Sequence, residues 1–254
     1  MIKPFAVMGL LKELRVAAED TRPLAVGGAL AAQLRKELIR DGDERAVREG
    51  GPEGASAYVH VLAAEPSPED EKLLRRAHRA RVPVVCLARE RYRVPFVLAT
   101  DVVVVEPGRG FPVEELTCAL ANRLGEGATP LAARLPVLRP AVFAWLIASF
   151  SRKNAIVGAA VWIPGVDLPV LTMNQMRLVL RIGSAYGEEI SNERLPELLA
   201  VLGGGLGFRA LARELLDAVP VAGWLIKGAV AYTGTRALGE AAVRLFEARA
   251  RARV

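Results

Sequence analysis

Four short apolar segments alternate with helix-forming stretches in the first half of the chain, and this alternation constrains the fold most strongly. Strands that are apolar on both faces and alternate with helices are typical of a parallel sheet covered on both sides. The sequence therefore predicts an α/β domain that binds ligands at the carboxyl ends of its strands. The four predicted strands are 23–28, 57–64, 82–88 and 99–106.

The stretches between these strands carry helix signals. Ser67 can cap a helix, Pro68 suits its first turn, and three acidic residues follow that favour the positive end of the helix dipole. The polar, glycine-rich stretch 41–54 is expected to be a loop. Helices are predicted at 29–40, 65–81 and 113–126, with an amphipathic helix from about Phe5 to Ala18 ahead of the first strand.

The first strand leads into two glycines and a helix, which is where a nucleotide-binding protein places its phosphate loop. A phosphate loop has the pattern G-x-x-x-x-G-K-[ST], in which the Lys reaches the phosphates and the hydroxyl binds magnesium. With Gly27 as the first glycine, the places of G-K-[ST] hold Ala32, Gln33 and Leu34. The sequence thus lacks both the ammonium group and the hydroxyl of a working loop.

The first half resembles the Era-like GTPase fold with its early strands lost. YVHVLAAEPSPEDEKLLRRAHRARVPVVCLARE is similar to the strand, short helix and strand that lead to the guanine-reading N-K-x-D motif of those GTPases. DVVVVEPGRGFPVEELTCAL is similar to their last strand, the loop after it and the final helix. The resemblance covers about residues 20–127 and implies a GTPase-like sheet.

The other motifs of a GTPase are also missing. A polar loop stands in place of the D-x-x-G element, so the groups that drive phosphoryl transfer are gone. We therefore expect a turn in a degenerate site, with no enzymatic activity and no cofactor. The backbone amides of Gly28 and Ala29 remain as a weak anion site at a helix N-terminus. The N-K-x-D positions are held by Ala88, Arg89, Glu90 and Arg91.

Other catalytic or metal-binding patterns are not visible in the sequence. His60 in a strand and His78 in a basic helix have no nucleophile in a known arrangement, and G-x-S-x-G, H-E-x-x-H and Cys/His clusters are absent. We interpret His60 as a hydrogen-bonded or edge residue. Cys86 and Cys118 both lie among apolar residues, which predicts buried, reduced thiols in a cytoplasmic protein.

The second half has a different composition, with apolar helices broken by glycine and proline. An apolar segment at 141–150 is expected to end at 151–154, and a helix at 174–187 is expected to end at Gly187. In the last segment, small residues recur every three or four positions, which lets helices approach closely. These small residues are Gly228, Ala231, Thr235, Gly239 and Ala242.

This half resembles the uncharacterised helical domain that bacteria fuse to, or encode beside, Era-like GTPases, as in YcjF-type proteins. The resemblance rests on IPGVDLPVLTMNQMRLVLRIGSAYG and VPVAGWLIKGAVAYTGTRALGEAAVRLFE, and covers about residues 139–248. It implies membrane association, which many members show. Asp167 and Gln175 are expected to form a buried hydrogen-bonded pair. The matching positions are Pro164, Asp167, Gln175, Met176, Tyr186, Gly187, Pro220, Gly223, Thr233, Ala237 and Gly239.

Charge and hydropathy limit the partners. The net charge is +6, but the basic runs carry no nucleic-acid motif, so we expect solvated helix faces and no nucleic-acid partner. A membrane-spanning helix needs about 20 mostly apolar residues. Only 155–173 approaches that length, and it contains Asp167 and two prolines.

Together these patterns predict two domains and a non-catalytic role. A degenerate GTPase-like domain, with the N-terminal helix, is expected at 1–127, a linker at 128–140 and a helical domain at 141–254. We expect a pseudo-GTPase scaffold or regulator in the cytoplasm or at the inner face of the membrane, with a protein partner that is a GTPase or a second copy. Two alternatives stay open: a nucleotide-binding protein or enzyme without a standard phosphate loop, and an integral membrane protein with inserted hairpins.

Overall fold

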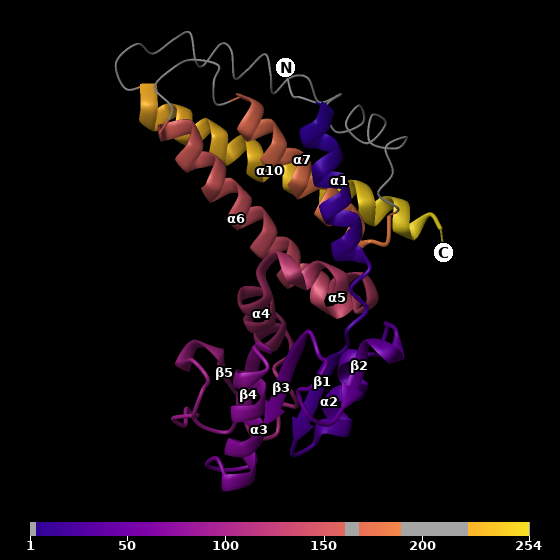
Figure 1. Cartoon of the computed structure of the whole chain (residues 1–254), viewed down its shortest axis with the longest axis vertical. Helices are drawn as coiled ribbons and strands as arrows, with labels where there is room; N and C mark the ends of the chain where they lie inside the picture. The colour runs from indigo at the N-terminus through magenta and orange to yellow at the C-terminus, as the bar shows by residue number, and fades with distance from the viewer. Residues whose placement is uncertain (1–3, 161–167, 189–222, 254) are drawn as a thin grey trace. The chain divides into compact units, whose positions relative to one another are not determined.

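The computed structural model describes residues 4–160, 168–188 and 223–253. The chain divides into two compact units, one of residues 20–142 and one that combines 1–19 with 143–254. Figure 1 shows the helices and strands of both units.

The unit of residues 20–142 is built on a five-stranded sheet with the strand order β2-β1-β3-β4-β5, and every neighbouring pair is parallel. This confirms the predicted parallel α/β architecture. The order is that of flavodoxin-like doubly wound sheets. The strands are β1 (Leu24–Gly28), β2 (Val47–Glu49), β3 (Ala57–Val61), β4 (Val84–Ala88) and β5 (Val102–Val104).

Strand β2 lies inside the stretch that the sequence predicts as a loop. It follows a single 3-10 turn, η1 (Glu44–Ala46), and its three residues pair with β1 at the edge of the sheet. Val47 is buried, whereas Glu49 is exposed. One buried apolar residue in a polar stretch gives no alternation to detect, which explains why the edge strand was missed.

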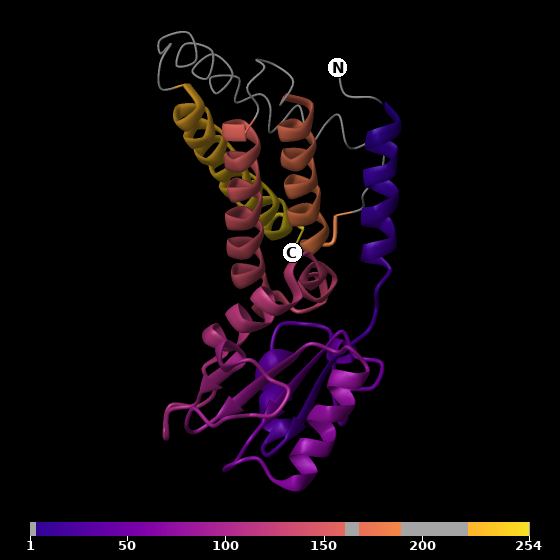
Figure 2. The ribbon, with the colours of Figure 1, turned by 60° about the vertical axis from the view of Figure 1, so that its left-hand side comes forward.

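Helices α2 (Ala31–Leu38) and α3 (Pro68–Arg79) lie on opposite faces of the sheet, as Figure 2 shows. Right-handed crossovers require this, because the connection from β1 to β2 and the connection from β3 to β4 run toward opposite edges of the sheet. Leu34 and Leu38 are the buried residues of α2. On the other face, Leu74 of α3 packs in one apolar cluster with Tyr58 and Cys86. A third helix, α4 (Val113–Leu124), contacts β4 and β5.

Helix α3 begins where its capping signal predicts. The Ser67 side chain accepts a hydrogen bond from the Asp70 backbone amide, and the Asp70 side chain accepts one from the Ser67 amide. Pro68 occupies the first turn. This reciprocal capping box satisfies two amides that the helix itself cannot pair.

The stretch predicted as a linker is folded. It begins at the last residue of η3 (Gly125–Ala128) and forms α5 (Thr129–Arg134) and η4 (Pro136–Leu138), and Leu131, Leu135 and Leu138 are buried. The guanidinium of Arg134 donates to the Asp43 carboxylate at 2.9 Å and to the Thr21 carbonyl oxygen at 2.8 Å. These contacts make the segment part of the α/β unit, which therefore extends to residue 142 rather than 127.

The other unit is helical in its described residues, with α1, α6, α7 and α10 (Figure 1). Helix α1 contacts α7, so the N-terminal helix belongs to this unit rather than to the α/β unit with which the sequence grouped it. The helices are α1 (Pro4–Ala18), α6 (Arg139–Ala160), α7 (Leu168–Ala185) and α10 (Gly223–Arg251).

Helix α6 continues through the polar residues 151–154, where the sequence predicts a break. Ser151 and Asn154 are buried, while Arg152 and Lys153 between them are exposed. Positions three apart lie on the same face of a helix. The polar residues therefore fit the helical period, and the expected break is wrong.

Small residues bring α6 and α10 into close contact. A methyl group at Gly158 would lie 3.1 Å from the Lys227 carbonyl oxygen, and one at Gly228 would lie 3.1 Å from the Ala155 carbonyl oxygen. Farther along, Gly239 packs against Ile147. The contacts run in opposite directions along the two helices, which are thus antiparallel. The small-residue stripe of α10 produces the close approach that it predicts.

Helix α7 ends at the glycine that the sequence selects. Gly187 has a φ of 78°, a left-handed conformation that favours glycine. The Glu188 amide donates to the Gly183 carbonyl oxygen and the Gly187 amide donates to that of Ser184, which is the Schellman pattern. Among the described residues, no helix combines the length and the apolar character that a membrane crossing requires.

Candidate functional site

The strand order reverses between β1 and β3, so a ligand crevice is expected at the carboxyl ends of these two strands. In doubly wound sheets, the crevice for a ligand opens where the strand order reverses. Here that point lies between β1, which ends at Gly28, and β3, which ends at Val61, and these two residues are paired in register. Gly27 and Gly28 are the last two residues of β1, and residues 65–67 lie in the loop after β3. Residues 89–91 and 106–110 lie in the loops after β4 and β5.

The two glycines at the predicted phosphate-loop position are required by packing. The phenol of Tyr58 reaches from β3 across β1, and a methyl group at Gly27 would overlap its hydroxyl oxygen. A methyl group at Gly28 would overlap the Val61 carbonyl oxygen, and Gly28 also has a φ of 82°. Only glycine combines that backbone conformation with so close an approach.

The backbone after these glycines is committed to the protein itself. The Ala29 amide donates to the Val61 carbonyl oxygen at 2.9 Å, so it is not available for the anion that the sequence suggested. Leu30 precedes α2 in a left-handed conformation, with a φ of 56°, and is 57% exposed. That conformation costs a residue such as leucine about 1–2 kcal/mol.

The remaining predicted positions of the loop are now placed. Ala32 and Gln33 are exposed on the first turn of α2, whereas Leu34 is fully buried in the core. The residue that the phosphate-loop pattern aligns with the magnesium-binding hydroxyl is therefore a core side chain. At the base-reading position, Ala88 is buried in β4 and its carbonyl oxygen accepts from the Val105 amide. The next three residues, Arg89, Glu90 and Arg91, are exposed.

A chain of polar side chains runs through the interior beside this point. The Tyr58 hydroxyl lies 2.7 Å from Nδ1 of His60, and Nε2 of His60 lies 2.7 Å from the Asp70 carboxylate. The Ser67 hydroxyl donates to the second carboxylate oxygen of Asp70 at 2.7 Å. Tyr58 and His60 are fully buried, whereas Ser67 is exposed. These polar side chains therefore connect the cap of α3 at the surface with the glycines of β1.

The protonation states follow from these partners. Burial opposes ionisation of Asp70, but the hydrogen bonds from Ser67 and then from His60 outweigh it, and the pKa of Asp70 is lowered. An ionised Asp70 accepts the proton of Nε2, so Nδ1 accepts the hydroxyl proton of Tyr58. Burial raises the pKa of Tyr58, which keeps this hydroxyl protonated.

This arrangement favours a structural role for His60. Both of its ring nitrogens are engaged and the ring has no solvent exposure. A general base needs a nitrogen within reach of a substrate proton. His60 is therefore hydrogen-bonded, as interpreted from the sequence. Two features of the sequence signal this row of polar side chains. Tyr58 and His60 are two residues apart and so lie on one face of a strand, and the S-x-x-D pattern forms a helix cap. The sequence does not predict that His60 and the cap meet.

The two cysteines differ in environment. Cys86 is fully buried beside this chain, and burial, together with Asp70 and Asp101, raises the pKa of its thiol to about 12. Cys118 is exposed on α4, which corrects the prediction that both thiols are buried. Leu116 and Leu120 of α4 are buried. A residue midway between them, two positions from each, points to the opposite side of the helix.

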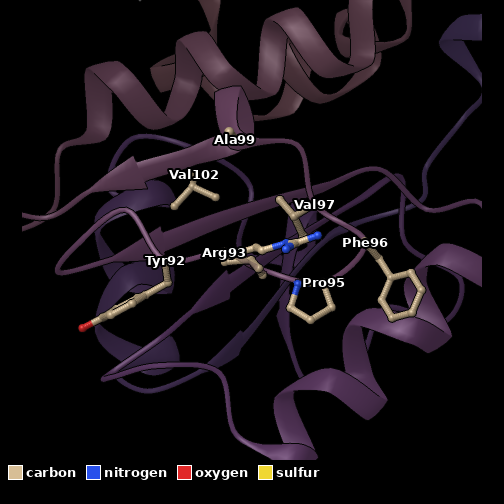
Figure 3. Close-up of a pocket in the computed structure, with 8 residues that line it drawn as sticks. Tyr92, Arg93, Pro95, Phe96, Val97, Ala99 and Val102 are labelled. Atoms are coloured by element: carbon tan, nitrogen blue, oxygen red, sulfur yellow. The ribbon is translucent and has the colours of Figure 1, made fainter.

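A hollow of about 570 Å³ lies under the loop between β4 and β5. It is lined by residues 92–97 together with Ala99 and Val102. Figure 3 shows the guanidinium of Arg93 lying across it and the Tyr92 hydroxyl pointing away. Phe96 contacts His78 of α3, with ring centroids 5.2 Å apart. The lining comes almost entirely from one surface loop, and no group of metal-ligand type converges anywhere in the described residues.

The helical unit has its own buried polar cluster. The Asn154 amide of α6 donates to the Thr235 hydroxyl of α10 at 2.8 Å and accepts from Asn174 of α7 at 2.8 Å. Gln175 also reaches the Thr235 hydroxyl, at 3.4 Å. The predicted partner of Gln175, Asp167, lies outside the described residues. Asn154 and Thr235 are buried, and their bonds across three helices fix the helix register, because a shifted helix would leave these two groups unpaired.

The other positions of the helical resemblance are dispersed. The Tyr186 ring stacks between Phe143 and Phe246, at 5.2 and 6.2 Å. The Thr233 hydroxyl is exposed and donates to the Ala229 carbonyl oxygen of its own helix. Gly239 lies at the contact with α6. Gly223 is the first residue of α10, and Pro164 and Pro220 lie outside the described residues.

Comparisons with models of known protein families, with curated proteins and with solved structures find no match to this chain.

Proposed function

We propose that the protein is a non-catalytic pseudo-GTPase scaffold or regulator that acts with a protein partner. The observation that carries the proposal is the filled end of β1. Tyr58 occupies the space over Gly27, and the Ala29 amide is bonded to Val61. A phosphate loop works by presenting unpaired amides to the phosphates. Here the Tyr58 hydroxyl fills the space over Gly27, and the Ala29 amide is bonded within the protein.

The strand order supports the proposal. In the parallel sheet β2-β1-β3-β4-β5, the positions that the resemblance matches to the phosphate and base motifs follow β1 and β4. These positions are Ala32, Gln33 and Leu34 in the first turn of α2, and Arg89 to Arg91 in the loop after β4. None of these side chains supplies the lysine, the magnesium-binding hydroxyl or the guanine-binding aspartate of the motifs.

The strongest case for an enzyme is the His60–Asp70 pair, because it resembles a general base and its orienting carboxylate. The burial of His60 and its second bond, to Tyr58, argue against that use. We therefore prefer a binding protein to an enzyme. We place it in the cytoplasm, as its reduced thiols predict, or at the inner face of the membrane, because the resemblance of the helical half implies membrane association.

Titration of the full chain with fluorescent GTP and ATP, with and without magnesium, tests the proposal. The expected result is no saturable signal with either nucleotide. Micromolar binding that depends on magnesium would show that the strand ends hold a nucleotide without the usual motif. That result would contradict the pseudo-GTPase proposal. Fractionation of cells with a carbonate wash of the membrane pellet tests the location separately.

A further inference from the structure

The connection from β4 to β5 crosses the sheet without a helix. Strand β4 ends at Ala88, and a single 3-10 turn, η2 (Ala99–Asp101), precedes β5, so residues 89–98 form neither helix nor strand. Parallel strands are usually joined through a helix that packs on the sheet, as α3 does between β3 and β4. The loop 89–98 therefore has to cover this part of the sheet with its own side chains.

The loop covers the sheet incompletely. Val94 is buried in one apolar cluster with Cys86 of β4 and Val102 of β5, and Tyr92 and Val97 pack against that cluster. The hollow of about 570 Å³ remains between these loop residues and Val102 (Figure 3). Pockets for small molecules typically measure about 300–1,000 Å³. The hollow therefore has the size of a small-molecule site.

The lining of the hollow is apolar except at one cation. Its side chains are those of valine, proline, alanine, phenylalanine and tyrosine, together with Arg93. The guanidinium of Arg93 lies across the hollow in Figure 3 and has no ion-pair or hydrogen-bond partner among the described residues. No described acidic side chain belongs to the lining. Since a guanidinium can donate two parallel hydrogen bonds to one carboxylate, the hollow combines apolar walls with a place for one anion.

One wall of the hollow is held in a strained conformation. Phe96 has a φ of 65°, a left-handed conformation that is rare for a bulky side chain. Its ring lies 5.2 Å from that of His78 and 5.9 Å from the guanidinium carbon of Arg75, both on α3. Such strain persists only where the surroundings impose it, and it collects at ligand sites. The contacts with α3 thus fix this wall before any ligand arrives.

We infer that the hollow, called here the β4–β5 site, binds a small organic acid with an apolar body. The body packs against Val97 and Val102, and the carboxylate accepts hydrogen bonds from Arg93. Burial of the apolar body supplies affinity. The guanidinium selects an anion over a neutral or cationic molecule of the same shape. This inference goes beyond the proposed function and does not depend on it.

Calorimetric titration of the full chain with three small amphiphiles tests the inference. The probes are octanoate, 1-octanol and octylammonium, which share one apolar chain and differ in the head group. The salt concentration is about 0.15 M, where distant charges are largely screened. Octanoate is expected to saturate a single site. Octanol should bind several-fold more weakly, because it has no charge to pair with the guanidinium, and octylammonium more weakly still.

Three variants locate the binding. Arg93→Gln should lower the affinity for octanoate about tenfold, the usual effect of losing hydrogen bonds to a charged group, and should leave the affinity for octanol nearly unchanged. The matched control is Arg91→Gln, an exposed arginine of the same loop outside the lining, which should bind like the wild type. Ala99→Leu places a larger side chain in the lining and should abolish binding. All three residues are exposed, and thermal unfolding confirms that each variant is folded.

Four results would overturn the inference. They are the absence of saturable octanoate binding, equal binding of octanoate and octylammonium, equal affinities of the Arg93→Gln and Arg91→Gln proteins for octanoate, and unchanged binding by the Ala99→Leu protein. The last result would place the acid elsewhere on the chain. The nucleotide titration is a separate test, because octanoate carries neither base nor phosphate. Loss of the β4–β5 site would leave the pseudo-GTPase proposal as it stands.

Discussion

The hydroxyl of Tyr58 lies in the space that a side chain at Gly27 would need. Residue 27 is therefore a glycine because a phenol from the neighbouring strand covers it. Tyr58 is held there by its bond to His60, and His60 by Asp70 at the cap of α3. A glycine that would suggest a phosphate loop in the sequence is, in the structure, part of the core.

Gly27→Ala is expected to destabilise the α/β unit by about 1–3 kcal/mol, the usual cost of overpacking a core. Gly28→Ala should cost more, because it adds a left-handed conformation to the overlap with Val61. Gly127→Ala is the control, since a methyl group there meets nothing within 4 Å. Urea unfolding followed by exposure of the Cys86 thiol measures all three. Equal midpoints for Gly27→Ala and Gly127→Ala would contradict the packing role.

Tyr58→Phe should cost about 1–3 kcal/mol, because it leaves Nδ1 of His60 buried without a donor. Tyr92→Phe removes a hydroxyl that points away from the hollow in Figure 3 and should have little effect. The same urea unfolding assay compares them. If both variants matched the wild type, the polar chain would contribute nothing to stability.

The pH dependence of stability should depend on Asp70. Its pKa is lowered in the folded state from the ordinary value of 3.8. The stability that it contributes is thus present above pH 3.8 and is lost as the pH falls through the lower, folded-state pKa. The stability gap between wild type and Asp70→Asn should stay constant from pH 7 to about 4 and shrink at lower pH.

Urea midpoints measured from neutral to acidic pH test this dependence. The pKa values of Asp20 and Asp43 are also lowered, so Asp70→Asn should flatten the acid limb of the curve without removing it. A gap that widened toward low pH would reverse the assigned sign.

The thiols should react in two classes. Exposed Cys118 is expected to react with a disulfide reagent at once, while Cys86 should react only on unfolding, because it is buried and its pKa is about 12. Thiol titration should therefore give one group per native chain and two in denaturant, the total in the sequence. Cys118→Ser should abolish the fast class. If both thiols of the native protein reacted at once, the burial of Cys86 in β4 would be contradicted.

Gly158→Val should separate α6 from α10, because its side chain would meet Ala231 and the Lys227 carbonyl oxygen. We expect a loss of about 1–3 kcal/mol or more from the helical unit. All three tryptophans lie in that unit, so their fluorescence reports on it.

Gly9→Ala in α1, with open space around it, should instead be neutral or stabilising, by up to about 1 kcal/mol.

Local signals in the sequence were sufficient for several elements. The cap at Ser67, the end of α7 at Gly187 and the stripe of α10 each depend on residues close in the chain, and the structure shows all three. The buried strands β1, β3 and β4 were recognisable from their apolar runs. The edge strand β2 was not, because its burial comes from pairing with β1 rather than from its own composition.

The features that decide the candidate site depend on contacts between distant segments. Tyr58 and Gly27 are on different strands, and His60 meets Asp70 across the sheet–helix interface. Neither strand shows in its own residues that these groups meet. The same reason explains α1, whose amphipathic pattern predicted packing but not that its partner would be α7.

The most direct test of the central claim, that the end of β1 is filled by the protein itself, is the nucleotide content of the freshly purified full chain. The protein is denatured, and the supernatant is separated by anion-exchange chromatography and compared with nucleotide standards. The account predicts no guanine or adenine nucleotide peak above that of the buffer. A nucleotide released in proportion to protein concentration would contradict it and would show that the strand ends hold a ligand.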